Sequence, residues 1–481
     1  MDARLRGHDG FGVLSMSLWN SSDIAKATKG TCSGSWNANA VAIDSRTVKA
    51  GDLFIALKGP NFDGHDFVAG AIAKGASGAL VSTIPDGVSK DACVVVLDVF
   101  QAMHDLGQAG RERSRAKIIA VTGSVGKTGH KEALRQVLSA QAASYANEGS
   151  FNNHWGVPLS LSRLPTDATY GVFELGMNHL GELGPLSRQV RPDIALITNI
   201  APVHIGNFNS LDEIANAKSE IFEGLSPSGY AVLNADNPYI EYLKQRARHF
   251  GISNIVTFGK NGTDAKLENF TLHSDTSDVS ATILGKKISY TIGAPGEHWV
   301  INSLAVLLCA GLAGADVAVA AKSISNLQLA QGRGTPQVIT SANGTFTLID
   351  ESYNASPIAV EMAIQVLAKK TLTGKRIIAL GDMRELGEHS NALHLGLVKP
   401  IVDAKIDKVF CCGEHMKHLF DALPDAIRGG YAFNSSDLAP MVASHMRDGD
   451  IITVKGSKSV GMQKVVDALL ALDKTNTKKA G

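Results

Sequence analysis

A chain of 481 residues predicts about three domains, because single domains usually contain roughly 100–200 residues. Hydrophobic residues make up 44% of the chain and charged residues 19%, a composition that excludes a disordered protein and is typical of a globular one. Lys plus Arg and Asp plus Glu balance at 46 each, so the net charge of zero gives no sign of nucleic-acid or anionic-membrane binding.

Cysteine content and hydropathy indicate the compartment. The five cysteines are odd in number and form no CxxC pair, which argues against a disulfide framework or a zinc site and fits a reducing environment. The N-terminus has no apolar signal segment, and the longest apolar stretch, Leu304 to Ala315, ends at Asp316 after twelve residues. We therefore expect a cytoplasmic protein without stable membrane insertion.

Short apolar runs rich in β-forming residues recur along the chain between helical patterns. They are Asp52 to Leu57, Gly78 to Val81, Val94 to Leu97, Lys117 to Thr122, Tyr170 to Glu174, Asp193 to Thr198, Tyr230 to Asn234, Phe346 to Asp350, Arg376 to Leu380, Lys408 to Cys411 and Ile451 to Val454. Strands that alternate with helices predict an α/β protein with mostly parallel, wound sheets, at least three in number. Two composition changes, at Arg111 to Lys117 and at Gln331 to Pro336, predict domain boundaries near residues 113 and 333.

The sequence GSVGKT, residues 123 to 128, lies between the strand Lys117 to Thr122 and a helix expected over Lys127 to Leu138. Backbone N–H groups at such a helix start favour a phosphate, Lys127 adds a cation, and the Thr128 hydroxyl is a ligand for Mg²⁺. The motif is a shortened phosphate loop, and the alternative is a glycine turn that only caps a helix. The candidate nucleotide contacts are Thr122, Gly123, Ser124, Val125, Gly126, Lys127 and Thr128.

Two polar residues follow later strands. Glu174 ends the strand Tyr170 to Glu174, and His204 follows the strand Asp193 to Thr198 through the loop NIAPVH. Both positions are at the carboxyl edge of a sheet, where wound α/β folds bind ligands. A strand-end acid and a surface histidine are the plainer alternatives.

Lys218 occupies an unusual position on a helix expected over Leu211 to Leu225. Successive 100° steps place it in the middle of an apolar stripe with Ile214, Ile221 and Leu225. An unpaired ammonium is costly to bury, so this lysine either extends to solvent, meets an anion or is chemically modified.

Further polar residues mark the later part of the chain. GEHWVIN begins a long helix expected to continue through Ala321, and it carries Asn302. GRGTPQ places Arg333 in a hinge, and the strand Phe346 to Asp350 leads into DESYNASP, with Ser356 and Pro357 as helix N-cap and first helical residue. Asp350 and Asn354 therefore lie at another carboxyl edge, the expected place for a nucleotide contact.

Together, AVTGSVGKT, FNNHWGVP, ELGMNHLGEL, NIAPVHIGNF, AKSEIF, GEHWVIN, GRG, DESYNASP and GDMRELGEHS resemble the Mur ligase family over about residues 16 to 470. DESYNASP and GDMRELG resemble most the member that adds D-alanyl-D-alanine. DSRTVKAGDLFIALKGPNFDGHDF, residues 44 to 67, is similar to the family's first domain.

The resemblance implies three domains. Residues 1–113 would form a small N-terminal α/β domain that binds the UDP-substrate, with 1–15 as an extension. Residues 114–332 would form a central P-loop ATPase domain with a mostly parallel sheet, and residues 333–481 a C-terminal Rossmann-like ligase domain.

The resemblance also implies site roles. Lys127, Lys218, His204 and Glu174 would be catalytic; Thr128 and Glu174 would bind one Mg²⁺, and His204 with a carbamylated Lys218 a second. ATP would further contact Asn302, Arg333, Asp350 and Asn354, and the UDP-substrate would contact Ser45, Arg46, Asn152 and Asn153. Three residues depart from the usual pattern: Gly129 and His130 stand where Thr or Ser is usual, and Trp299 where Asn is usual.

The implied activity is ATP-dependent ligation of D-alanyl-D-alanine to UDP-N-acetylmuramoyl-tripeptide through an acyl phosphate, by a monomer that binds no nucleic acid. One alternative is a folylpolyglutamate synthase-like ligase, which usually reaches its phosphate loop within some tens of residues, whereas 122 precede Gly123 here. The other is a non-catalytic nucleotide-binding partner subunit, which would lack Glu174, His204 or Lys218; this chain has all three.

Overall fold

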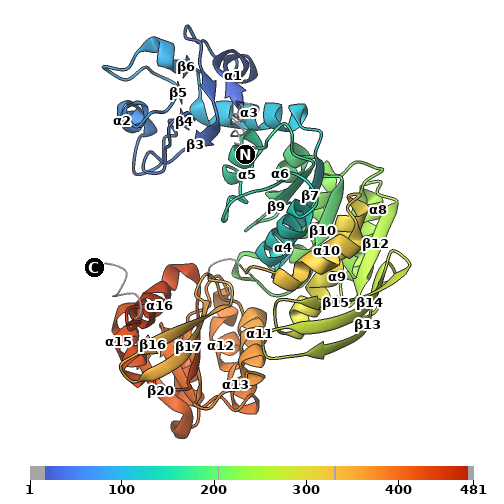
Figure 1. Cartoon of the computed structure of the whole chain (residues 1–481), viewed down its shortest axis with the longest axis vertical. Helices are drawn as coiled ribbons and strands as arrows, with labels where there is room; N and C mark the ends of the chain where they lie inside the picture. The colour runs from blue at the N-terminus through green and yellow to red at the C-terminus, as the bar shows by residue number, and fades with distance from the viewer. Residues whose placement is uncertain (1–16, 204, 330–331, 475–481) are drawn as a thin grey trace, which may run out of the picture. The chain divides into compact units, whose positions relative to one another are not determined.

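The structure, a computed structural model, describes residues 17–203, 205–329 and 332–474 (Figure 1). They divide into two compact units: residues up to 115 with 154–168, and residues 116–153 with everything from 169 onward. Within these ranges, no helix has the length and apolar character needed to cross a membrane.

The first unit contains a parallel sheet of order β3-β4-β5-β6 and a two-stranded antiparallel sheet of β1 and β2. The strands are β1 (Trp19–Asn20), β2 (Asn37–Ala38), β3 (Ala40–Ala42), β4 (Asp52–Ile55), β5 (Gly78–Val81) and β6 (Cys93–Val95). The helices are α1 (Ser21–Thr28), α2 (Val68–Ala73), α3 (Val99–Arg113) and α5 (Gly156–Ser162).

Helices α3 and α5 pack closely although more than forty residues separate them. Two glycines of α3 permit this approach, because a Cβ at Gly107 would lie 2.5 Å from the Pro158 carbonyl oxygen and one at Gly110 would lie 2.3 Å from that of Leu161. The chain therefore returns to the first unit through α5 after it has begun the second.

The second unit contains a nine-stranded sheet of order β15-β14-β13-β12-β11-β10-β7-β9-β8. Its strands are β7 (Lys117–Thr122), β8 (Ser144–Ala146), β9 (Tyr170–Glu174), β10 (Ile194–Ile197), β11 (Tyr230–Asn234), β12 (Asn254–Gly259), β13 (Ala265–Leu272), β14 (Ser277–Ile283) and β15 (Lys286–Ile292). All neighbours from β8 to β13 are parallel, and β13, β14 and β15 form an antiparallel meander. The helices of this region are α4 (Lys127–Ser139), α6 (Leu183–Val190), α7 (Leu211–Ser219), α8 (Ile240–His249), α9 (Glu297–Leu312) and α10 (Val317–Ser323).

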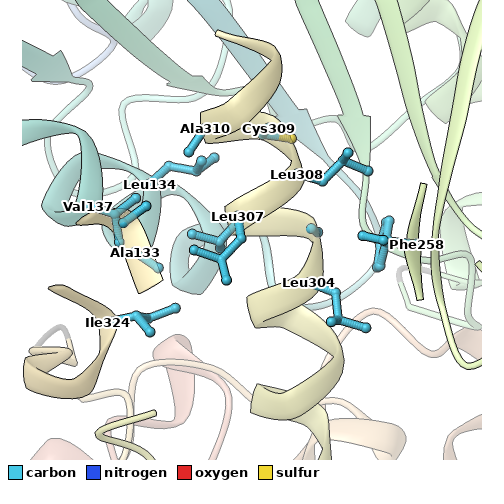
Figure 2. Close-up of a cluster of buried hydrophobic side chains, with 14 of the residues drawn as sticks. Ala133, Leu134, Val137, Phe258, Leu304, Leu307, Leu308, Cys309, Ala310 and Ile324 are labelled. Atoms are coloured by element: carbon cyan, nitrogen blue, oxygen red, sulfur yellow. The ribbon is translucent and has the colours of Figure 1, made fainter. Parts of the chain in front are cut away.

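Helix α9 lies at the centre of the hydrophobic core of this sheet and packs beside α4 and α10 (Figure 1). Figure 2 shows Leu307 of α9 pointing towards Ala133 and Val137 of α4, while Leu304 and Leu308 point towards Phe258 of β12. Leu304, Leu307 and Leu308 are fully buried, which explains why α9 is apolar almost all round.

The same unit contains a six-stranded sheet of order β16-β17-β21-β18-β19-β20, in which only β16 is antiparallel to its neighbour. The strands are β16 (Thr335–Ser341), β17 (Gly344–Glu351), β18 (Arg376–Gly381), β19 (Lys408–Cys412), β20 (Arg428–Ala432) and β21 (Ile451–Lys455). The helices are α11 (Pro357–Ala368), α12 (Ser390–Leu395), α13 (Val398–Asp403), α14 (Met416–Ala422), α15 (Ser435–His445) and α16 (Gln463–Leu470).

Both faces of the six-stranded sheet are covered by helices, as in doubly wound folds. Along β18, Ile377 and Ala379 belong to one core cluster with α15 and α16, whereas Ile378 and Leu380 belong to another with α11, α13 and α14. Successive side chains of a strand point to opposite faces, so a strand buried on both sides is apolar throughout.

The predicted fold class is confirmed: an α/β protein with parallel-rich sheets. The predicted lengths of two helices were wrong. The helix expected through Ala321 ends at Leu312, because Gly314 adopts a positive φ of 92° and Asp316 caps a new helix, α10. The helix expected over Leu211 to Leu225 is α7 followed by a 3-10 segment, Glu220–Gly224.

We expect Leu307→Ala to lower the free energy of unfolding of the nine-stranded-sheet region by about 2–5 kcal/mol, because it leaves a cavity in a packed core. The control is Val319→Ala on α10, whose side chain is exposed. Denaturant unfolding measures both variants; a Leu307→Ala midpoint equal to that of the control would contradict the central position of α9.

Candidate active site

The phosphate loop connects β7 to α4 and adopts a backbone that needs glycine. Gly123 and Gly126 have φ angles of 147° and 84°, and a Cβ at Gly123 would lie 1.9 Å from the Thr198 hydroxyl oxygen. The loop is fixed from the β10 side: the Ser124 hydroxyl donates to the Ala201 carbonyl at 2.9 Å, and the Val125 N–H donates to the Asn199 side chain at 3.0 Å. No side chain caps the start of α4 at Gly126, which leaves its first turn available to an anion.

Lys127 is the first residue of α4 and lies against the loop. Its ammonium donates to the Gly123 carbonyl at 2.8 Å. Burial lowers the pKa of Lys127, an effect that nearby Arg333 reinforces and Glu174 opposes. The lysine is therefore placed where a phosphate group would offset the cost of burying its charge.

Glu174 lies beside the phosphate loop because β9 pairs in parallel with β7, with Glu174 opposite Val121. The carboxylate is almost fully buried and both of its oxygens are hydrogen-bonded: the Thr128 hydroxyl donates to Oε2 and the Asn152 amide donates to Oε1, each at 2.8 Å. A carboxylate and a hydroxyl at this separation are the hard oxygen ligands that Mg²⁺ prefers. The residues present thus fit a Mg²⁺ ion.

Lys218 is buried on α7, with 2% of its surface exposed. Burial, and secondarily the charge of Lys127, depress its pKa well below the ordinary value. Among the described residues its ammonium has no hydrogen bond or ion pair. This burial excludes the interpretation that Lys218 extends to solvent, and the lowered pKa favours the neutral amine. His204, its predicted partner, lies outside the described residues.

The residues from later in the chain that were predicted to contact ATP differ in their neighbours and in their exposure. The Arg333 guanidinium donates to the Thr128 hydroxyl at 3.1 Å and lies over the Tyr353 ring, and the Asn302 amide is 3.9 Å from the ideal Cβ position of Gly126. The Asp350 carboxylate, in contrast, is buried and accepts from the Ser352 N–H and hydroxyl. Asn354 is exposed.

The predicted substrate residues belong to both units. Ser45 and Arg46 lie between β3 and β4 in the first unit, where exposed Arg46 pairs with Asp44. Asn152 lies in the second unit and binds Glu174, as described above, and Asn153 follows it.

The three departures from the usual pattern pack together around the phosphate loop. Gly129 leaves space for the Trp299 ring, which would lie 3.1 Å from a Cβ at that position. His130 is buried, and its Nδ1 donates to the Gly126 carbonyl at 2.8 Å. Burial lowers the pKa of His130 to about 4, so the ring is neutral at pH 7.

Sequence reasoning missed two polar residues of this site, Lys131 and Asn147. Both are buried, and Lys131 donates to the Asn147 carbonyl at 2.6 Å. A signal existed for Lys131: it precedes Leu134 and Leu138 by three and seven residues, the same core-facing position on a helix that identified Lys218.

A phosphate loop with a buried carboxylate and a buried lysine beside it is typical of an enzyme that transfers a phosphoryl group. Three stretches match Mur ligase families: residues 37–113 match "Mur ligase family, catalytic domain", residues 121–310 "Mur ligase middle domain", and residues 336–458 "Mur ligase, glutamate ligase domain". The chain belongs to the Mur ligase family.

Within that family, the chain is similar to proteins named UDP-N-acetylmuramoyl-tripeptide–D-alanyl-D-alanine ligase. It is 37% identical to the one from Rickettsia prowazekii, over 94% of this chain and 99% of the relative, and 33% identical to that of Escherichia coli K12, over 90% and 93%. Among solved structures, MurF from Acinetobacter baumannii superposes with a TM-score of 0.80 at 29% identity, covering 94% of this chain and 99% of that one. MurF from Thermotoga maritima, solved in complex with ADP, shares the fold with a TM-score of 0.73 at 23% identity, over 90% and 97%.

We expect Gly123→Ala to weaken ADP binding at least tenfold, because the new Cβ would displace the loop from Thr198. The control is Gly70→Ala in α2, where a Cβ meets nothing within 4 Å. Calorimetric titration with ADP measures both; unchanged affinity in Gly123→Ala would show that this backbone geometry is not needed for binding.

Proposed function

We propose that this chain catalyses the ATP-dependent ligation of D-alanyl-D-alanine to UDP-N-acetylmuramoyl-tripeptide, which completes the pentapeptide precursor of peptidoglycan. The observation that carries the choice of substrates is the similarity, over nearly the whole length of both chains, to relatives named for that reaction. The site supports the ATP chemistry independently, through the Thr128–Glu174 contact beside the phosphate loop.

The reaction must first activate a carboxylate, which is a poor electrophile. Transfer of the ATP γ-phosphoryl group to the tripeptide carboxylate gives an acyl phosphate and ADP. Lys127 and the N–H groups at the start of α4 stabilise the charge on the transferring group. The neutral amine of D-alanyl-D-alanine then attacks the acyl carbon. Phosphate leaves from the tetrahedral intermediate as the new amide forms, and the proton lost by the amine leaves with it.

Two Mg²⁺ ions are part of the proposal, and when bound they supply charge neutralisation at the phosphate oxygens. Thr128 and Glu174 would hold one ion. His204 and Lys218, once carbamylated, would hold the other. Carbamylation joins the uncharged amine to carbon dioxide and releases a proton, and the burial of Lys218 favours the uncharged form. The product is a carboxylate-like group that suits a metal better than an ammonium does.

The three predicted domains divide the substrates. Residues 1–113, with Ser45 and Arg46, would bind the UDP end of the acceptor, and residues 114–332 would bind ATP, Mg²⁺ and the reacting carboxylate, with Asn152 and Asn153 facing the acceptor peptide. Residues 333–481 would add Arg333, Asp350 and Asn354 to the ATP site, and Asn302 would reach it from α9. We place the enzyme in the cytoplasm as a monomer.

We expect Lys127→Ala to reduce ligation more than tenfold without unfolding the protein, because the side chain neutralises phosphate charge. The matched control is Lys117→Ala on β7, since the Lys117 side chain is 58% exposed and forms a surface ion pair with Asp193. Phosphate release is measured with ATP, UDP-N-acetylmuramoyl-tripeptide and D-alanyl-D-alanine. Phosphate release that does not depend on D-alanyl-D-alanine would contradict the proposed reaction.

We expect Lys218→Ala to lose nearly all activity and to recover part of it with formate or acetate, which would replace the missing carboxylate-like group. Lys218→Arg should stay inactive with either acid, because its guanidinium keeps its charge and fills the space. The rescue of turnover by formate and acetate is the measurement. Near-normal turnover of Lys218→Ala without added acid would contradict carbamylation.

A further inference from the structure

We propose that Lys131 is a positioning residue for this reaction: from inside α4 it fixes the turn of residues 147–152, and through that turn it orients Glu174 for Mg²⁺. This proposal depends on the proposed function in one respect: the proposed function identifies the nucleotide that the metal accompanies. The contacts that support it lie within residues 116–153 and 169–176, all in the second unit.

The Lys131 ammonium is completely buried and fully hydrogen-bonded. Its side chain is 0% exposed, and its three N–H groups meet three acceptors: the Asn147 carbonyl at 2.6 Å, the Glu132 carboxylate at 2.9 Å and the Gly149 carbonyl at 3.3 Å. A buried charge persists only where such partners offset its desolvation. Two of the three are main-chain oxygens of one turn, so the charge of Lys131 serves to hold that turn.

Asn147 connects the turn to the backbone of Glu174. It directly follows β8, and its side chain accepts from the Glu174 N–H at 2.8 Å and donates to the Glu174 carbonyl at 3.1 Å. The same amide also donates to the Phe151 carbonyl at 2.8 Å. Asn147 thus extends the pairing of β8 with β9 by one position. Its hydrogen bond to Phe151 also connects the start of the turn to its end.

Asn152 connects the turn to the carboxylate of Glu174. Its amide donates to Oε1 at 2.8 Å, and its carbonyl accepts from the Gly176 N–H at 2.8 Å. A Cβ at Gly176 would lie 3.0 Å from the Asn152 amide, so this close fit needs glycine. Glu174 is therefore fixed at its N–H, its carbonyl and both carboxylate oxygens.

Helix α4 reaches Glu174 in two ways. Thr128 contacts the carboxylate directly, and Lys131, three residues later on the same face, acts through the turn. Lys131 touches neither Glu174 nor the phosphate loop, which distinguishes it from Lys127 and Thr128. Partners that orient a metal ligand typically change metal affinity 10–100-fold when they are lost.

The test separates metal binding from nucleotide binding. ADP affinity is measured by calorimetry with Mg²⁺ and again with EDTA, for the wild type and for Lys131→Met, which keeps the chain length and removes the charge. We expect the Mg²⁺-dependent gain in affinity to fall about tenfold, while affinity in EDTA changes less than about twofold because Lys127 and the loop stay intact. Binding of Mn²⁺ to the ADP complex, followed by electron paramagnetic resonance, should weaken in parallel.

Arg135→Met is the matched control, since Arg135 lies on the same helix and binds the same Glu132 but does not reach the turn. It should leave both affinities unchanged. Asn152→Ala provides a second approach should Lys131→Met fail to fold: it should reduce the Mg²⁺-dependent gain by itself. In a double variant with Lys131→Met, the two losses should not add, because both act through the same carboxylate.

Equal losses of affinity with Mg²⁺ and with EDTA in Lys131→Met, or an unchanged Mg²⁺-dependent gain in Asn152→Ala, would overturn the proposal. Neither measurement uses the peptide substrates. A wild-type enzyme that binds Mg²⁺ and ADP as expected but does not ligate D-alanyl-D-alanine would therefore count against the proposed function and not against Lys131.

Discussion

The parallel pairing of β7 with β9 determines the geometry of the candidate active site. Its register sets Glu174 opposite Val121, so the carboxylate appears at the same sheet edge as the phosphate loop that begins two residues later. Parallel strands bring their carboxyl ends together, and loops that are distant in sequence therefore meet. The sheet places Glu174 close to the phosphate loop. The glycines then set the backbone of the loop, and hydrogen bonds from Thr128 and Asn152 orient the Glu174 carboxylate.

Three lysines near this edge are withdrawn from solvent, and their ammonium groups have three different environments. Lys127 is half-buried, with hydrogen bonds to the Gly123 and Ser124 carbonyls of the loop, and its charge can be met by a ligand. Lys131 is enclosed and saturated by protein acceptors, which makes it a structural charge. Lys218 is enclosed without a partner among the described residues, and its pKa falls accordingly. Lys131 and Lys218 are similarly buried and differ in their hydrogen-bond partners.

The sequence predicted those features that depend on local pattern. Strand β9 and helix α4 follow from short apolar runs and helical spacing, and Lys218 was recognised as a cation within an apolar stripe. The contacts of Asn147 could not be predicted, because they depend on β8 pairing with β9 across more than twenty residues. The β13–β15 meander was missed because its strands alternate apolar residues with polar or charged ones such as Lys266, Glu268, Ser280 and Thr282, a composition also typical of loops. The assignment of substrate-contacting residues stays a prediction, as do the boundaries near residues 113 and 333.

Helix α5 has a consequence for how the protein can be dissected. It belongs by sequence match to the middle domain, which spans residues 121–310, yet it packs against α3 through the glycine contacts at Gly107 and Gly110. A fragment that stops at residue 115 would expose the α3 face that α5 normally covers, and a fragment that starts at residue 116 would carry α5 without its partner. Each of two pieces cut there would retain an apolar surface without its partner, because the first unit is built from two separate stretches of the chain.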